Sequence, residues 1–269
     1  MILVGLIGLR RERRLQSALV EQLLSAGGSE GFRQSSAVGS KSGLPVPVAR
    51  YLDWALPQGK RILSARLQQA GILRTDARSD RWMSFEAEHL VAPPAVGFAW
   101  NARVAVAPFV HVRVRDALVA GQGSGRVSLL SAFLVAADGG TAEMNSGSLH
   151  RYLAEAVWYP TALLPSAKLR WSAIDENRAL ATLTEGGTTV TLEFRFADTG
   201  EVTGIYTPAR WGSFDRGYKR LPWEGHFRNY EEVQGMVVPM EGEVGWYLEE
   251  EWQPVWRGRV TSASYELVR

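Results

Sequence analysis

The chain has 269 residues, of which 46% are hydrophobic and 22% are charged, and these fractions are ordinary for a packed globular protein. It contains no cysteine, which excludes disulfides, thiolate metal ligands and cysteine nucleophiles. The formal charge is +2, and acidic residues are interleaved with the arginines nearly throughout, so we do not expect a nucleic-acid-binding protein.

Four histidines (His89, His111, His150 and His226) are scattered along the chain without the i, i+4 pairing of a helical zinc site. The sequence therefore predicts neither a metal ion nor a cofactor. Ten tryptophans stand out, because Trp is favoured in cores, at interfaces and on pocket walls.

The beginning of the chain is apolar from Met1 to Gly8 and is followed by a cluster of arginines. The apolar run is far shorter than the ~20 residues of a membrane span, and a secretory signal would have its basic residues in front. We expect this segment to pack on the body of a cytoplasmic protein. The alternative is a peripheral contact with a membrane through the N-terminus.

A first helix is predicted over residues 11–25, where Leu15, Ala18, Leu19 and Leu23 recur at helical spacing. Residues 26–44 are rich in Gly and Ser, which is typical of a flexible linker. We therefore predict that residues 1–44 form an N-terminal helix and linker, and that residues 45–269 form a single β domain. A short helix over residues 48–54 opens that domain, with prolines in its first turn.

From residue 61 onward the pattern is that of β-strands. Residues 190–196 alternate strictly, the Asp198-Thr199-Gly200 turn follows, and residues 202–206 resume the alternation, which predicts a hairpin. Further strands are expected over residues 61–69, 82–88, 98–100, 104–106, 109–114, 127–135 and 260–268.

Residues 147–158 interrupt this pattern with a predicted helix. Its apolar face is formed by Leu149, Tyr152, Leu153 and Ala156, Ser148 is the expected N-cap, and Pro160 ends it. Antiparallel strands interrupted by one central helix predict a mainly β (α+β) fold. We expect a strongly curved antiparallel sheet, or half-open β-barrel, wrapped around that helix.

Several motifs resemble those of a bacterial family of unknown function, DUF6544, over roughly residues 45–268. They are Trp82-Met-Ser-Phe-Glu-Ala-Glu-His, Pro94-x-x-Gly97-Phe98-x-Trp100, Arg115-Asp116 with Gly121-x-Gly123, Gly147-x-Leu149-x-Arg151-Tyr152-Leu153-Ala154-Glu155-x-x-Trp158-x-Pro160-Thr161, Trp171, Ile174-Asp175 and Trp246.

The strand order and the Phe-x-Trp strand are also similar, more remotely, to the lipoprotein carriers LolA and LolB and to the violacein-pathway enzyme VioE. This resemblance implies a half-open barrel whose concave side is plugged by helices. The carriers bind acyl chains, and VioE works without a cofactor. Unlike the carriers, this chain has no lipobox cysteine.

The predicted central helix also carries a charged pair. Arg151 and Glu155 are four residues apart on one side of the helix, and Trp158 extends that side. Facing a cavity, the guanidinium could clamp a carboxylate or phosphate while the indole stacks on an apolar ligand. The alternative is a structural ion pair with Trp158 in the core.

Two other groups suggest acid–base chemistry. Asp116 is expected at a strand end, as a general base or as an acceptor in the turn before the glycine-rich loop. Glu86 and Glu88 share a strand face next to His89, although exposed charges on a solvated sheet face explain them more simply.

The leading hypothesis is non-enzymatic or accessory binding of a hydrophobic small molecule, lipid-like or aromatic. The ligand would be oriented by Arg151 and Glu155 and bounded by Trp100, Tyr152, Trp158 and Trp171. The alternative is a cofactor-free enzyme on the same scaffold, with Glu155 or Asp116 as its acid–base group. A structural or partner-binding module is the third option.

Overall fold

The computed structural model describes residues 2–28, 43–56, 60–214 and 217–268, and in the first helix the side chains of residues 2–9 and 12 are outside this description. The helices are α1 (Ile2–Ala26), α3 (Val46–Ala55) and α4 (Ala142–Glu155), with short 3-10 helices η1 (Pro93–Ala95), η2 (Ala156–Trp158) and η3 (Pro160–Leu163). The strands are β1 (Ile62–Leu73), β2 (Met83–Ala92), β3 (Gly97–Ala107), β4 (Val110–Val119), β5 (Gln122–Leu129), β6 (Phe133–Gly139), β7 (Leu169–Ala173), β8 (Arg178–Glu185), β9 (Thr188–Phe196), β10 (Val202–Phe214), β11 (Gly217–Val233), β12 (Met236–Leu248) and β13 (Glu251–Leu267).

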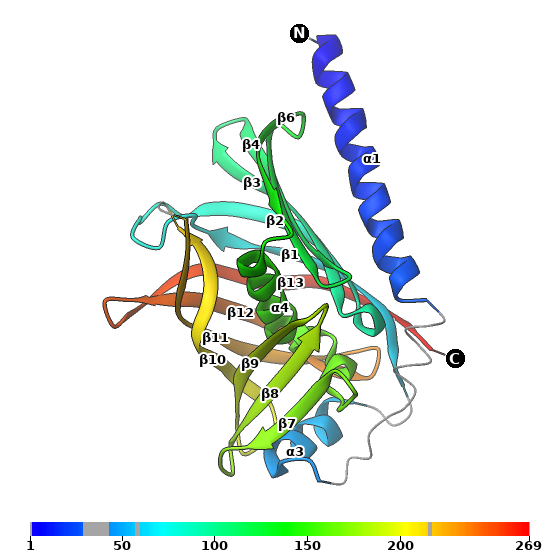
Figure 1. Cartoon of the computed structure of the whole chain (residues 1–269), viewed down its shortest axis with the longest axis vertical. Coiled ribbons are helices and arrows are strands. Elements are labelled where there is room, and N and C mark those ends of the chain that lie inside the picture. The colour runs from blue at the N-terminus through cyan, green and yellow to red at the C-terminus, as the bar shows by residue number, and fades with distance from the viewer. Residues whose placement is uncertain (1, 29–42, 57–59, 215–216, 269) are drawn as a thin grey trace.

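All thirteen strands belong to one antiparallel sheet built from two meanders. Strands β1 to β6 follow one another as hairpins, β7 to β13 do the same, and β1 pairs with β13 where the meanders meet. Strands β6 and β7 are the two edges, so the sheet curls without closing (Figure 1). This confirms the predicted mainly β half-barrel.

Helix α4 carries the chain from one edge of the sheet to the other across the concave side (Figure 1). Its N-cap is Thr141, whose side chain accepts a hydrogen bond from the Met144 N–H at 3.2 Å. The prediction that this helix starts at Ser148 is therefore wrong: the Gly139-Gly140 pair precedes Thr141, and the helix begins right after that cap. The predicted apolar face is confirmed, because all four of its residues are buried.

Gly123 on β5 explains how closely α4 lies on the sheet. A Cβ at this position would lie 2.5 Å from Ser148 Oγ and 2.7 Å from the Met144 carbonyl oxygen. The close approach of α4 requires a glycine at position 123. Of the glycines after Asp116, Gly121 therefore supports the turn with its positive φ, and Gly123 allows the helix to pack on the sheet.

The concave face of the sheet is the hydrophobic core. In β9, Val190, Leu192, Phe194 and Phe196 are buried and the residues between them face outward, which is the alternation that predicted the hairpin. The Trp158 indole donates to the Pro239 carbonyl oxygen at 2.8 Å, and Tyr265 donates to the Trp158 carbonyl oxygen. Much of the half-barrel interior is therefore filled by packed side chains.

Two helices cover the outside and one end of the half-barrel. Helix α1 includes the predicted helix 11–25 and packs Leu23 with Leu90, Ala99 and Val119 on the convex face. Helix α3 is as predicted apart from its bounds, and its Tyr51 ring contacts Phe196. None of the described helices is long and apolar enough to cross a membrane.

Two predictions cannot be compared with the structure. Most of the predicted linker, residues 29–42, lies outside the described residues, as do the side chains of the N-terminal apolar segment. The division into residues 1–44 and 45–269 stays a prediction.

Candidate functional site

An apolar cleft of about 240 Å³ opens beside α4, where the chain leaves the helix and enters β7. Tyr152 of α4 forms one wall. The remaining walls are apolar side chains from η1 and η3, the segment before β7, the strands β1, β7 and β8, and the residue that follows β13: Ile62, Pro93, Pro94, Val96, Ala162, Leu164, Pro165, Ala167, Leu169, Leu183 and Val268. The volume is slightly below the usual 300–1,000 Å³ of small-molecule pockets, so the cleft fits a short acyl chain or a small ring system.

Local sequence signals build the walls of this cleft. Pro93 starts η1, and Val96 ends it with a left-handed φ of 47°. On the opposite wall, the Ser166 hydroxyl accepts hydrogen bonds from the Lys168 and Leu169 N–H groups at 3.2 and 3.0 Å. Ser166 thereby fixes the turn that leads into β7.

The polar groups of the cleft are mostly cationic or hydroxyl-bearing. Arg61, Lys168, Thr161 and Ser166 lie among the apolar residues, and the Lys168 Nζ forms an ion pair with Glu185 Oε2 at 2.5 Å. The Tyr152 hydroxyl donates to the Pro93 carbonyl oxygen at 3.2 Å. Burial and the charge of Glu185 raise the pKa of Tyr152, so the phenol stays protonated.

A second polar group of residues surrounds Arg151 on the concave side. Its Nε donates to Glu155 Oε1 at 2.8 Å and its Nη1 donates to Asp116 Oδ2 at 2.9 Å. The guanidinium carbon also lies 5.0 Å from the Phe98 ring centre and 4.9 Å from that of Trp100. Two carboxylates and two rings therefore occupy the guanidinium, and the structural alternative describes this geometry better than a ligand clamp does.

His89 adjoins this cluster from β2. The imidazole is fully buried, and its Nε2 lies 3.5 Å from Glu155 Oε2. Burial lowers the pKa of His89 well below its usual value, and Arg151 lowers it further; burial raises the pKa of Glu155. Glu86 and Glu88 point to the other face of β2, where Glu88 pairs with Arg66, so the three residues do not form one acid–base group.

Asp116 lies in the middle of β4 and not at a strand end, because pairing with β3 and β5 continues beyond it on both sides. Its half-buried carboxyl has a raised pKa, caused by burial and by Glu155 and opposed by Arg151. The role of Glu155 or Asp116 as an acid–base group stays a prediction.

Arg210 is a member of this region that the sequence reading missed. It comes from β10, donates to the Gly147 carbonyl oxygen at 3.1 Å, and its guanidinium lies over the rings of Trp223 and Trp246. Burial and the charge of Arg151 lower its pKa to about 10. No sequence spacing relates Arg210 to α4, because only the curl of the sheet brings them together.

The six predicted ligand residues do not lie around one cavity. Tyr152 lines the apolar cleft, whereas Trp100 and Trp158 are buried in the core, and Arg151 and Glu155 pair with each other. Trp171 on β7 donates to the Leu163 carbonyl oxygen and packs on Phe194. The late tryptophans Trp246 and Trp256 also belong to the core cluster or pack against it.

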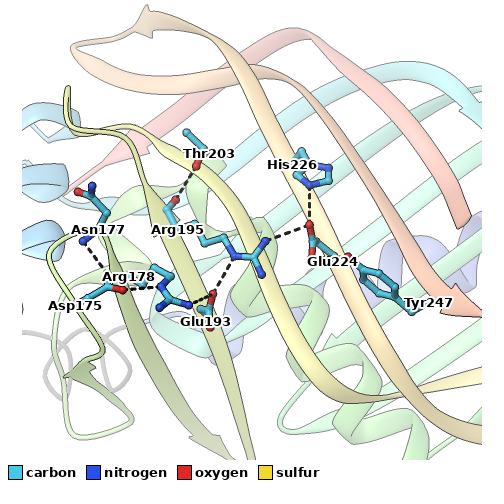
Figure 2. Close-up of polar contacts among 9 residues, drawn as sticks. All are labelled: Asp175, Asn177, Arg178, Glu193, Arg195, Thr203, Glu224, His226 and Tyr247. Atoms are coloured by element: carbon cyan, nitrogen blue, oxygen red, sulfur yellow. Dashed lines mark hydrogen bonds and ion pairs between the residues drawn. The ribbon is translucent and has the colours of Figure 1, made fainter. Parts of the chain in front are cut away.

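The outer face of β8 to β12 carries a third polar network (Figure 2). Glu224 Oε1 accepts from His226 Nε2 at 2.9 Å and lies 3.2 Å from Arg195 Nη1, while Glu224 Oε2 accepts from the Tyr247 hydroxyl at 3.0 Å. Because these charged groups satisfy one another across neighbouring strands, the network stabilises the sheet and offers no open site.

The described residues contain no group of three or more His, Asp or Glu side chains arranged to hold a metal ion. Among known protein families, the model of a family of unknown function, DUF6920, matches residues 42–265. The chain belongs to this family. The expected membership of DUF6544 is therefore wrong.

No curated protein matches the sequence. Among solved structures, a LolA superfamily protein from Nitrosomonas europaea is 9% identical, with 83% of this chain and 93% of that chain covered and a TM-score of 0.39. A DUF1329 family protein from Desulfovibrio piger is also 9% identical, with 83% and 94% covered and a TM-score of 0.47.

Proposed function

We propose that the protein binds a small anionic amphiphile, an acyl or aromatic carboxylate, in the cleft beside Tyr152. The observation that carries this proposal is a recess with mostly apolar walls and two cationic side chains, Arg61 and Lys168. Pockets of this composition hold an apolar body by burial and orient it through a few charged groups.

The ligand class is that expected from the sequence, but the orienting group is different. Arg151 already pairs with two carboxylates, whereas Lys168 forms one ion pair and its side chain is 37% exposed. A ligand carboxylate at the rim would share Lys168 with Glu185. The apolar body would lie against Leu164, Leu183 and Ile62.

Titration calorimetry with decanoate tests the proposal, and decanamide serves as the uncharged comparison. Ala167→Asp adds a negative charge at an exposed position of the cleft wall, and we expect it to weaken decanoate binding by about tenfold. Decanamide should bind more weakly than decanoate to the natural chain and should be affected less by the substitution.

Ala173→Asp is the matched control, because Ala173 is an exposed alanine on β7 outside the cleft. It should leave decanoate binding unchanged. Equal affinity of the two variants, or the absence of binding by the natural chain, would contradict the proposal.

A further inference from the structure

Exposed apolar side chains gather at one end of the half-barrel. Of the eleven large hydrophobic residues that are exposed in the described part of the chain, six belong to the β3–β4 turn and to the β5–β6 hairpin: Phe109, Leu129, Leu130, Phe133, Leu134 and Val135. The Leu130 N–H donates to the His111 carbonyl oxygen at 2.9 Å, which holds the two turns side by side. None of these residues lines the cleft beside Tyr152.

Phe109 is the most prominent residue of this end. Its side chain is 101% exposed, and its φ of 60° lies in the left-handed region that is unfavourable for a bulky residue. A fully exposed phenyl ring at a hairpin tip contributes nothing to the core. It therefore points to a contact outside the molecule.

The charges around these turns are mostly positive. From His89 to Asp138 the sequence has four arginines and two acidic residues: Asp116, whose carboxylate is paired with Arg151 on the concave side, and Asp138, whose carboxylate accepts a hydrogen bond from the Tyr218 hydroxyl. Arg103 and Arg113 are cross-strand partners just behind the Phe109 turn, with Glu86 opposite Arg103 on β2. Burial and these two arginines lower the pKa of His111, in keeping with a local positive potential.

Helix α1 adds positive charge at the same end. It packs on the convex face through its C-terminal part, and its N-terminal part points toward the end where the two turns lie (Figure 1). Arg10, Arg11, Arg13 and Arg14 all have exposed side chains.

We propose that this end of the molecule, comprising the two turns and the arginines behind them, binds the surface of a bilayer that contains anionic phospholipids. The apolar turns enter the interface, and the arginines contact the phosphates. The side chains of the two turns are exposed and protrude. A folded partner would need a complementary hollow to accept them, whereas the fluid interface of a bilayer needs none. The association is peripheral and does not depend on the proposed cleft ligand.

Co-sedimentation with vesicles tests this proposal, using phosphatidylcholine alone and phosphatidylcholine mixed with phosphatidylglycerol. The natural chain should sediment with the mixed vesicles and much less with the neutral ones, and added salt should release it. Phe109→Asp should reduce binding by about tenfold or more, because one large apolar anchor is lost and a negative charge is gained. Arg103→Gln should reduce it about fivefold.

These variants are expected to fold. Phe109 is fully exposed, and Asp tolerates a positive φ better than Phe does. Val46→Asp is the control, because Val46 is 70% exposed in the first turn of α3, away from the two hairpin turns. It should bind mixed vesicles like the natural chain.

Three results would overturn the proposal. The first is that the natural chain stays in the supernatant with mixed vesicles, and the second is that Phe109→Asp and Val46→Asp bind these vesicles equally. The third is that sedimentation velocity without lipid shows a dimer that Phe109→Asp dissociates while vesicle binding is absent. That end would then be an interface between two copies of the chain.

Discussion

Arg151 shows at the scale of one residue why a charged motif on a helix can belong to the fold. It joins α4 to β4 through Asp116, pairs with Glu155 within α4, and lies against two aromatic rings. Its side chain is 19% exposed and that of Glu155 is 15% exposed, so removal of the guanidinium would leave the largely buried Glu155 carboxylate, and the half-buried Asp116 carboxylate beside it, without their cation. Breaking such a pair costs far more than breaking a pair at the surface.

Arg151→Met should therefore lower the free energy of unfolding by about 3–5 kcal/mol, measured by urea denaturation. Adding Glu155→Gln and Asp116→Asn should restore a large part of the loss, since both uncompensated charges are then gone. Arg66→Met is the matched control, because Arg66 and Glu88 form an exposed pair, and it should cost less than about 1 kcal/mol. Similar losses in Arg151→Met and Arg66→Met would show that the cluster does not stabilise the fold.

At the scale of elements, the contact between α4 and β5 determines how the half-barrel is filled. Gly123→Ala would place a Cβ 2.7 Å from the Met144 backbone oxygen, and a backbone atom cannot move aside without shifting the helix. We expect a loss of about 3 kcal/mol in urea denaturation.

Gly125→Ala is the internal control for this contact. It lies two residues further along the same face of β5, where a new Cβ would meet its nearest neighbour, the flexible Met144 side chain, at 3.4 Å. It should cost less than about 1 kcal/mol. If Gly123→Ala and Gly125→Ala lower the free energy of unfolding equally, the close approach of α4 to β5 does not explain why residue 123 is a glycine.

The elements also show which features could be predicted from the sequence. Alternation in β9 and the apolar face of α4 follow from side-chain periodicity, so the hairpin, the helix face and the curved sheet were predictable. The alternation predicted for residues 202–206 is wrong, because a bulge after Val202 buries Ile205 and leaves Tyr206 only half-buried. Periodicity says which face is apolar, but not whether the concavity behind it is filled. For that reason the sequence predicts Trp100 and Trp158 as ligand contacts, although both are buried in the core, and it does not reveal Arg210, which reaches α4 across the curl of the sheet.

At the scale of the whole molecule, the two faces of the sheet belong to separate hydrophobic clusters, and α1 packs only on the smaller one. The main core lies on the concave face, whereas Leu23 packs on the convex face with a small group that includes Leu90 and Val119. The family match begins at residue 42, after α1. We therefore propose that the half-barrel folds without its first 41 residues.

A chain that begins at residue 42 should unfold in one cooperative transition, at a temperature only a few degrees below that of the full chain. The reason is that removal of α1 exposes only the small convex cluster, while the thirteen-stranded sheet and α4 keep their contacts. Differential scanning calorimetry measures the transition, and decanoate titration should give the same affinity as the full chain, because no residue before Arg61 lines the cleft in the described structure. Loss of cooperative unfolding would mean that α1 is part of the folding unit, in spite of its position outside the half-barrel. If the shortened chain folds cooperatively but binds vesicles more weakly, the arginines of α1 contribute to membrane binding and are not needed for folding.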